Sequence, residues 1–184
     1  MQEVVEVRWA TAADLELVAA LEEEVYEPAD RVPRELARSW FERNDRMIRL
    51  LVGPRDAFLG YYWIVPVRGP VLSEFVAGRL TEWDFRAEDI AAPEEMFACE
   101  EMYLCSMAMV RRQSRALLVL IEDLTALLEE YRTMGRLRRL YAIAASVEGR
   151  NLLRRHLGFR LLLPGSQRRD GHDAYVRELD PAKQ

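Results

Sequence analysis

Residues 102–131 constrain the fold of this chain more than any other segment. The run 102–110, MYLCSMAMV, is typical of a strand; it breaks into the basic turn 111–115, RRQSR, and residues 116–131 then continue as an apolar helix. A strand that leads through a short basic turn into a helix directs backbone N–H groups and the positive end of the helix dipole at one point. Such a turn suits an anion, and a pyrophosphate best. The alternative is an ordinary strand–helix connection with solvated arginines.

Length and composition indicate one globular domain over residues 1–184. Half of the residues are hydrophobic and 31% are charged, which is typical of a globular protein with a sizeable core. No apolar run approaches the ~18 residues that a membrane helix needs. The N-terminus is acidic and lacks the basic-then-apolar layout of a signal peptide. We therefore expect a cytoplasmic protein without membrane contact.

The net charge of −5 is unevenly distributed along the chain. Residues 1–101 contain 22 acidic and 11 basic side chains, and residues 102–184 contain 9 acidic and 15 basic ones. The basic half favours an anionic ligand, and the acidic half favours an amine or another cation. Charged helix surfaces without a binding role are the alternative. Nucleic acid is disfavoured as a partner, because the whole chain is acidic.

The cysteine and histidine residues do not indicate a disulfide or a metal site. Cys99 and Cys105 are six residues apart in one strand-like run, which would separate their Cα atoms by ~20 Å, far beyond disulfide reach. His156 and His172 are not near either cysteine in sequence, so no metal-ligand spacing is present. We expect two reduced thiols and no metal.

Hydrophobic periodicity and turn residues predict alternating strands and helices. We expect an α/β (α+β) domain with a mixed, mostly antiparallel sheet flanked by helices. Gly135 is predicted to end the helix that follows the basic turn. The predicted strands are 4–8, 47–52, 57–65, 98–110, 137–145, 158–163 and 174–179. The predicted helices are 12–26, 34–43, 71–80, 116–131 and 147–156.

Three segments resemble the GNAT superfamily of acyl-CoA-dependent N-acyltransferases. Residues 7–15, VRWATAADL, resemble its opening strand and the capped start of its first helix. Residues 107–118 resemble its central strand, pyrophosphate loop and following helix. Residues 144–159, ending in Leu-Gly-Phe, resemble its late strand and helix and are the most specific of the three. An insertion at about residues 66–95 is similar to one subgroup of that family and is expected to be helical.

The resemblance implies acetyl-CoA as co-substrate, without a metal. In the family, main-chain amides of the basic loop hold the CoA pyrophosphate, and the end of the central strand pairs with the pantetheine arm. Ser114 stands where the family has its first loop glycine, and serine can still cap the helix and donate to phosphate. For Ser146 and Asn151 the alternative role is helix capping alone. The expected CoA-binding residues are Met109, Val110, Arg111, Arg112, Gln113, Ser114, Arg115, Ala116, Ser146 and Asn151.

Candidate catalytic residues follow less directly. The family's usual general acid, a tyrosine, is replaced here by Arg154, which could stabilise a thiolate by its charge. The usual glutamate position on the central strand falls on Leu104, so Glu100 and Glu101 are the nearest candidates for the general base. Glu100 shares strand parity with Val110, which would let it reach the site through a water. The alternative is that both glutamates solvate the start of the strand.

Three functions remain open from the sequence. The leading one is a bacterial-type N-acetyltransferase that moves an acetyl group from acetyl-CoA to the primary amine of a small molecule or peptide. The second is a non-catalytic GNAT-like module that binds CoA or protein partners, and the third is an α/β protein for another phosphate ligand. Self-association as a homodimer is also open. We further expect residues 66–95, which include Glu82 and Asp84, to form an acidic lip at the acceptor entrance. Tyr103, Cys105 and Ser106 are expected near the cleft, with strand packing as their alternative role.

Overall fold

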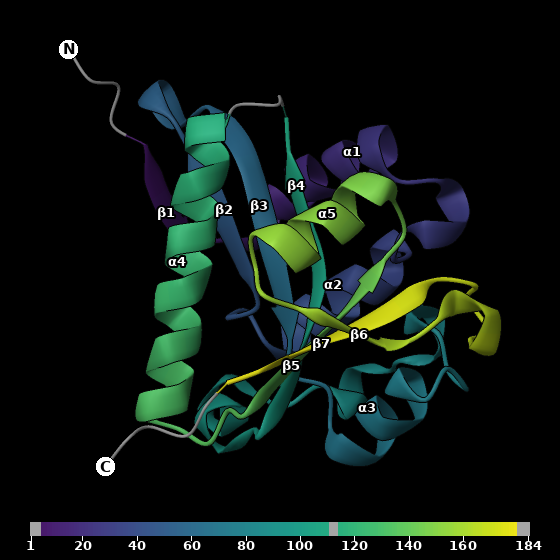
Figure 1. Cartoon of the computed structure of the whole chain (residues 1–184). Coiled ribbons are helices and arrows are strands. Elements are labelled where there is room, and N and C mark those ends of the chain that lie inside the picture. Colours follow the sequence, from purple (N-terminus) through teal and green to yellow (C-terminus); the bar gives the residue numbers. More distant parts are fainter. Residues whose placement is uncertain (1–4, 111–113, 180–184) are drawn as a thin grey trace.

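One seven-stranded sheet organises the computed structural model, which describes residues 5–110 and 114–179. The strand order is β1-β2-β3-β4-β5-β7-β6 (Figure 1). Neighbouring strands are antiparallel, except that β4 and β5 are parallel. The strands are β1 Glu6–Trp9, β2 Ile48–Val52, β3 Phe58–Val65, β4 Glu101–Met109, β5 Arg139–Ala144, β6 Arg160–Leu163 and β7 Asp173–Glu178.

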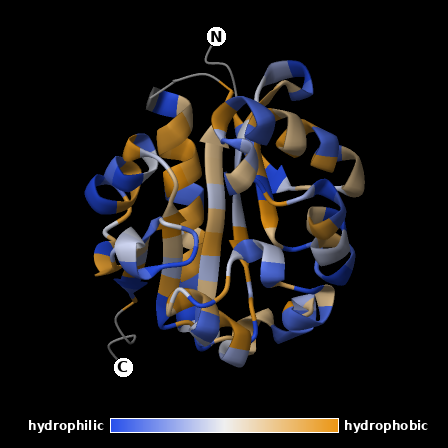
Figure 2. Ribbon diagram, turned by 90° about the vertical axis from the view of Figure 1, so that its right-hand side faces the viewer, coloured by the Kyte–Doolittle hydropathy of each residue, from blue (hydrophilic) through white to orange (hydrophobic). Residues whose placement is uncertain are grey.

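Helices cover both faces of this sheet and enclose two hydrophobic cores (Figure 1). One core is formed with α1, α2 and α3, and the other with α4 and α5. Figure 2 shows hydrophobic residues concentrated along the strands, while the helices alternate hydrophobic and hydrophilic positions. The helices are α1 Leu15–Val25, α2 Arg34–Arg43, α3 Gly69–Val76, α4 Ser114–Thr133 and α5 Val147–Arg155. The prediction of a mixed, mostly antiparallel sheet flanked by helices is confirmed.

Helix α4 illustrates how the sequence produces this arrangement. Leu120, Leu124 and Leu128 follow at a spacing of four, so they share one helix face, and all three are buried against the sheet. The same helix is tied to β2 and β3 by polar contacts. Arg49 makes two hydrogen bonds to the Asp123 carboxylate, at 3.0 and 2.6 Å, and the Tyr62 hydroxyl donates to it at 2.6 Å.

Two local predictions need correction. The strand expected from residue 98 begins at Glu101, because Pro93–Ala98 forms a short 3-10 helix. Gly135 follows α4 but is not in the left-handed conformation of a glycine cap. A Cβ atom there would lie 2.6 Å from the carbonyl oxygens of both Phe97 and Tyr131. This glycine therefore serves close backbone approach and not a positive φ.

The expected insertion at 66–95 consists of α3 and further short 3-10 helices. Glu82–Asp84 and Ala87–Asp89 are two of these, and Pro93–Ala98 begins within the same segment. In the Glu82–Asp84 segment, the Thr81 backbone N–H and hydroxyl both donate to the Asp84 carboxylate, at 2.8 and 3.0 Å. This capping arrangement fixes the backbone around Glu82.

A bulge in β4 changes which side chains of that strand share a face. Trp63 of β3 is opposite Ser106, and the next residue, Ile64, is opposite Leu104, so Cys105 is an extra residue. A single extra residue exchanges the two faces of a strand along its remaining length. Tyr103 and Ala108 consequently belong to the core beneath α1–α3, although five residues separate them.

Strands β4 and β5 pair only over part of their length. Their register runs from Glu101 opposite Arg139 to Leu104 opposite Ala142, while β4 continues to Met109 and β5 to Ala144. The unpaired carboxyl ends of two parallel strands therefore flank an opening in the sheet. In α/β sheets, ligands bind outside such carboxyl ends.

Among the described residues, no helix is both long enough and apolar enough to cross a membrane.

Candidate functional site

A cleft of about 1370 Å³ begins where β4 and β5 separate. Met107, Ala108 and Met109 line it from β4, and Ile143 and Ala144 line it from β5. The wall on one side is α5, with part of α4. The wall on the other side is α1, the Glu82–Asp84 segment and the loop that precedes β7. The cleft thus connects two ends with different chemistry.

The α5 end contains three of the residues expected to bind a cofactor. Met109, Ser146 and Asn151 line the cleft there. Ser146 also caps α5, because its Oγ accepts a hydrogen bond from the Gly149 N–H at 3.0 Å. The capping role considered for Ser146 is therefore real, and its position in the cleft leaves a binding role as a further prediction.

The other expected cofactor residues are placed differently. The Val110 N–H donates to the Leu59 carbonyl at 2.9 Å, so this amide is used within the sheet. Ala116 is buried in the core beneath α4, and Arg115 is exposed. Ser114 begins α4. The predictions for Arg111, Arg112 and Gln113 lie outside the described residues.

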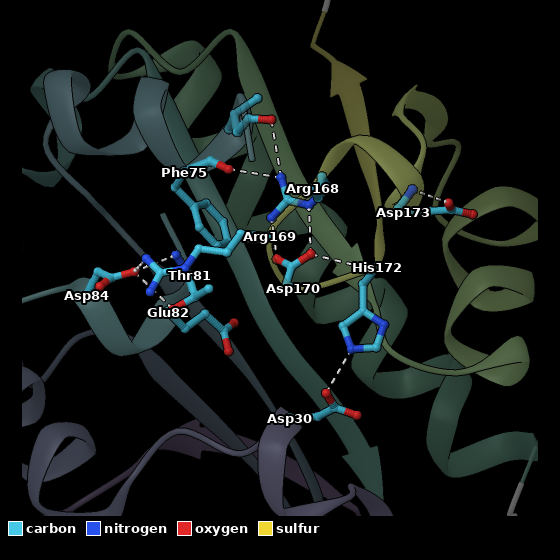
Figure 3. Close-up of polar contacts among 12 residues, drawn as sticks. Asp30, Phe75, Thr81, Glu82, Asp84, Arg168, Arg169, Asp170, His172 and Asp173 are labelled. Carbon is cyan, nitrogen blue, oxygen red and sulfur yellow. Dashed lines mark hydrogen bonds and ion pairs between the residues drawn. The ribbon is translucent and has the colours of Figure 1, made fainter. Parts of the chain in front are cut away.

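Glu82 projects from the opposite wall into the other end of the cleft (Figure 3). We call this the acceptor end, after the acceptor entrance expected from the sequence. Its Oε1 accepts hydrogen bonds from the Tyr103 hydroxyl and, at 3.4 Å, from the Cys105 thiol. Burial raises the pKa of this carboxyl to about 7; the two hydrogen bonds lower it less, and the nearby Asp170 and Asp30 charges raise it further. A carboxyl that titrates near neutrality can accept a proton from a substrate and release it again.

A second carboxyl, Glu22, lies on α1 at the same end and is buried. The Tyr61 hydroxyl is 2.8 Å from its Oε1, and Tyr61 is in turn 2.5 Å from Ser106 Oγ. Ser106 Oγ donates to the Tyr26 hydroxyl at 3.1 Å. Burial raises the pKa of Glu22 to about 7, with a smaller contribution from the Glu82 charge, and burial raises the pKa of Tyr26 to about 12.

The rim of the acceptor end is held by a buried arginine (Figure 3). The Arg168 side chain is 0% exposed. It donates to the carbonyls of Phe75 and Val76 at 2.8 and 3.2 Å, and to the Asp170 carboxylate. The chain can pass this closely because Gly78 has a φ of +78° and lacks a Cβ, which would lie 2.8 Å from Arg168 Cγ. The loop before β7 is thereby fixed to the end of α3.

Two further polar contacts join this loop to the facing wall (Figure 3). His172 Nε2 is 2.7 Å from the Asp30 carboxylate. Arg169 is 3.5 Å from the Asp84 carboxylate. Glu82, Asp84, Asp30, Asp170 and Glu22 all line the cleft. Its acceptor end is therefore strongly acidic, and Glu82 and Asp84 form part of that lining, as the acidic-lip hypothesis requires.

The structure places the three residues predicted to be catalytic away from this cleft. Glu100 is exposed and precedes β4; Glu101 pairs with Arg139 at 2.9 Å and accepts a hydrogen bond from Tyr141 at 3.0 Å. Both lie at the opposite end of β4 from Met109. The Cys105 bulge also breaks the parity that was expected to align Glu100 with Val110. Arg154 is exposed on α5, whereas the cleft-lining residues of this helix include Gly149 and Leu152.

Sequence reasoning found part of the acceptor end and missed the rest. Tyr103, Cys105 and Ser106 were expected near the cleft and do line it. Glu22 and Tyr26 had no motif, because Glu22 occupies an ordinary position of an amphipathic helix and Tyr26 is the extended residue that follows it. The one available signal for Glu22 was a glutamate on the face that carries the buried Val18 and Leu21. Among the described residues, no group of three or more His, Cys, Asp or Glu side chains could hold a metal ion.

No protein-family model matches the chain, and no curated protein matches it. Solved structures do match its fold. The GphF GNAT-like decarboxylase in complex with isobutyryl-CoA aligns with a TM-score of 0.65 and 16% identity, over 95% of this chain and 100% of that one. The loading GNATL domain of CurA from Lyngbya majuscula aligns with a TM-score of 0.65 and 12% identity, over 95% of this chain and 98% of that one.

An acetyltransferase gives a similar alignment. Mosquito arylalkylamine N-acetyltransferase like 5b matches with a TM-score of 0.61 and 14% identity, over 96% of this chain and 100% of that one. These identities are low, but the alignments extend over nearly the whole of both chains. The fold of this chain is that of the GNAT superfamily.

Proposed function

We propose that this chain is an acyl-CoA-dependent N-acyltransferase that transfers an acetyl group to a primary amine. The observation that carries the proposal is Glu82: a carboxyl with a pKa of about 7 in the cleft that opens between β4 and β5. A neutral amine is the nucleophile in such a reaction, so an ammonium acceptor must first lose a proton. Glu82 is the group at the acceptor end suited to take it.

The cleft residues fit an acyl-CoA at the end opposite Glu82. The unpaired ends of β4 and β5 leave backbone groups to face an extended ligand arm, and α5 begins at the cleft with its N-terminus capped by Ser146. Met109, Ser146 and Asn151 would contact the ligand there. GphF in complex with isobutyryl-CoA supports this assignment by its fold. Acyl-CoA supplies an activated thioester carbonyl.

The proposed reaction balances as an ammonium plus an acyl thioester giving an amide, a thiol and one proton. Glu82 first accepts a proton from the ammonium. The neutral nitrogen then attacks the carbonyl carbon, the C–N bond forms and the C–S bond breaks. The nitrogen loses its second proton, and the sulfur takes up one proton to leave as the thiol. Holding both reactants in one cleft makes the attack effectively intramolecular.

The charge of the acceptor end favours an amine over an anionic substrate. The residues Glu22, Asp30, Glu82, Asp84 and Asp170 line it. Arg168 and Arg169 are close by, but they contact Asp170 and Asp84 respectively. An acyl group bearing a carboxylate, which a decarboxylase would act on, would therefore face like charges, to which Glu22 and Glu82, with a pKa of about 7, contribute in part at neutral pH. A cationic amine would be attracted by them.

The proposal is tested by thiol release from acetyl-CoA with a panel of primary amines. Glu82→Gln should lower kcat by ~10²-fold, the order expected for loss of a general base, and should leave acetyl-CoA binding unchanged in calorimetric titration. Glu88→Gln, an exposed glutamate in the next short helix, is the matched control and should behave as the wild type. Acetyl-CoA binding without turnover on any amine would instead support the non-catalytic module, and the absence of both would refute the proposal.

A further inference from the structure

Four side chains next to the proposed base form one continuous hydrogen-bonded series. It runs from Glu22 through the Tyr61 hydroxyl and Ser106 Oγ to the Tyr26 hydroxyl, with separations of 2.8, 2.5 and 3.1 Å. The Tyr26 hydroxyl is also 3.5 Å from the Met107 carbonyl oxygen, its acceptor at the far end. The series crosses from α1 to β3, then to β4, and returns to Tyr26, the residue that follows α1.

Counting the protons that the series can donate shows when Glu22 must be protonated. Each hydroxyl has one proton to donate. If Tyr26 donates to the Met107 carbonyl, Ser106 must donate to Tyr26 and Tyr61 must donate to Ser106. The contact between Tyr61 and Glu22 then has a donor only if Glu22 is protonated. If Glu22 is ionised, every hydroxyl turns toward it and Tyr26 no longer donates to Met107.

The second arrangement has one proton fewer: Glu22 has lost its proton, and one proton has left the series at the Tyr26 end. The Tyr26 end opens to the cleft, because Tyr26, Ser106 and Met107 all line it. Tyr61, in contrast, is 0% exposed. A buried middle excludes water, so a proton that moves within the protein between Glu22 and Tyr26 passes along the side chains; Glu22 itself lines the acceptor end of the cleft.

We propose that Glu22, Tyr61, Ser106 and Tyr26 form a proton relay that delivers a proton from Glu22 to the sulfur of the departing thiol. This inference rests on the proposed acyltransferase function and adds the acid that this function needs. Sulfur takes the Tyr26 proton, and Tyr26, Ser106 and Tyr61 each take the proton of the next member. Glu22 becomes ionised and regains a proton through the same series from water in the cleft.

The positions of the two carboxyls separate their tasks. Glu82 contacts Tyr103 and Cys105, at and before the β4 bulge. Tyr26 meets Met107 beyond the bulge, on the part of β4 that has separated from β5. The relay therefore opens nearer to the divided strand ends at which the thioester is expected, and Glu82 opens toward the acidic acceptor end.

Burial, more than its charged and titratable neighbours, favours the protonated form of Glu22 up to about neutral pH. Burial is the main cause of its raised pKa, and the Glu82 charge adds to it, while the Tyr61 hydrogen bond and the Arg31 charge act in the opposite direction. Cys105 of β4 and Tyr26, which follows α1, also interact with the Glu22 charge. With a pKa of about 7, the carboxyl can both give and regain a proton at neutral pH.

The relay is tested first by the pH dependence of kcat. Tyr61→Phe cuts the series without removing the ring, so kcat should fall by ~10²-fold. In the wild type, kcat should decline above neutral pH because Glu22 ionises. In Tyr61→Phe this decline should disappear, while KM for acetyl-CoA stays unchanged. Ser106→Ala should behave alike, and Ser106→Thr, which keeps the hydroxyl, should restore most of the rate.

Tyr62→Phe is the matched control. Tyr62 is the next residue of β3 and is equally buried, but its hydroxyl donates to Asp123 on the other face of the sheet. It should lose stability and keep the wild-type pH profile. If Tyr61→Phe and Tyr62→Phe change kcat and its pH dependence equally, the series is structural and the relay is refuted.

A second measurement needs no acceptor and so separates the relay from the proposed function. Infrared difference spectra across neutral pH should show a protonated carboxyl band that Glu22→Gln removes. Tyr26→Phe, three hydrogen bonds from Glu22, should shift the midpoint of that band, and Tyr62→Phe should not. A wild type that shows this coupling but acylates no amine contradicts the proposed function alone. A midpoint unaffected by Tyr26→Phe contradicts the relay.

Discussion

At the scale of single residues, Glu22 and Glu82 make the stability of the fold decrease as the pH rises. Burial raises the pKa of each carboxyl from 4.5 to about 7, so the folded chain holds those protons more tightly than the unfolded chain does. Their favourable contribution is complete below about pH 4.5 and is lost as the pH rises through about 7. Asp14 behaves in the opposite way, because its hydrogen bonds with Arg8 help to lower its pKa to about 2.

The upward direction of the Glu22 pKa shift predicts the effect of Glu22→Gln on the free energy of unfolding. At pH 8 the variant should be more stable than the wild type by ~1–3 kcal/mol, because it avoids an ionised carboxylate in a buried site. At pH 5 the two should be nearly equal. Urea unfolding at both pH values measures the difference, and Glu24→Gln, on the exposed side of α1, is the control. A stabilisation equal at both pH values would show that the charge of Glu22 is not its cause.

The residues of the cleft also show how much of the site could be predicted from the sequence. Ser146 and Met109 belong to contiguous segments with a recognisable order, so their place in the cleft could be predicted. Glu22 and Ser106 come from segments more than eighty residues apart and meet only through Tyr61. Glu101 was a candidate base by its position in sequence, but Arg139 and Tyr141 hold it at the far end of β4. Contacts of this kind depend on the packed structure and leave no local pattern.

At the scale of elements, polar contacts fix α4 to the sheet in addition to its leucine stripe. The side chains of Arg49 and Asp123 are only 16% and 20% exposed, and Arg49 also stacks on the Trp9 ring, 4.7 Å from its centroid. Removal of one partner from such a pair leaves the other charge partly buried and unpaired.

Asp123→Ala should therefore lower the free energy of unfolding by ~2–4 kcal/mol, as measured by urea denaturation. Glu122→Ala, an exposed neighbour on the same helix, should cost less than ~0.5 kcal/mol. If the two substitutions cost the same, the ion pair contributes little and packing alone holds α4 in place.

Arg168 fixes the loop before β7 by polar contacts, in the way that Arg49 and Asp123 fix α4, and it lies next to the cleft. Its hydrogen bonds to Phe75, Val76 and Asp170 hold the acceptor rim. Arg168→Lys retains the charge but not the planar set of donors. We expect it to raise KM for the amine several-fold and leave acetyl-CoA affinity unchanged in calorimetric titration. A change in acetyl-CoA affinity as large as the change in amine KM would contradict a local role.

At the scale of the whole molecule, acidic side chains from distant segments of the chain meet at one end of the cleft. The net charge is −5. Asp30, Asp84 and Asp170 line the acceptor end, and Glu22 and Glu82, with a pKa of about 7, add negative charge there as they ionise. A concentration of one charge in a concave, partly buried site raises the local concentration of the opposite ion. Salt screens that attraction at exposed positions.

Asp84→Asn should raise KM for a cationic amine and make KM less sensitive to salt, because Asp84 is exposed at the rim. Acetyl-CoA affinity should stay as in the wild type. Steady-state kinetics at ~0.05 and ~0.5 M salt measure both effects. Glu130→Gln, the same change of charge on the exposed side of α4, is the control; equal responses in the two variants would exclude a local steering effect.

The extra residue at Cys105 makes the site depend on the length of β4 as well as on its composition. Before the bulge the face of β4 beneath α1–α3 carries Tyr103, and after it the same face carries Ser106 and Ala108. In a regular strand of the same sequence, Tyr103 and Ser106 would point to opposite faces, because they are three positions apart. The hydroxyl of Ser106 could then not keep both its neighbours while Tyr103 stays aligned with Glu82. An alignment of β4 with the corresponding strand of another protein therefore has to place Cys105 as an extra residue before positions on the two sides of it can be compared.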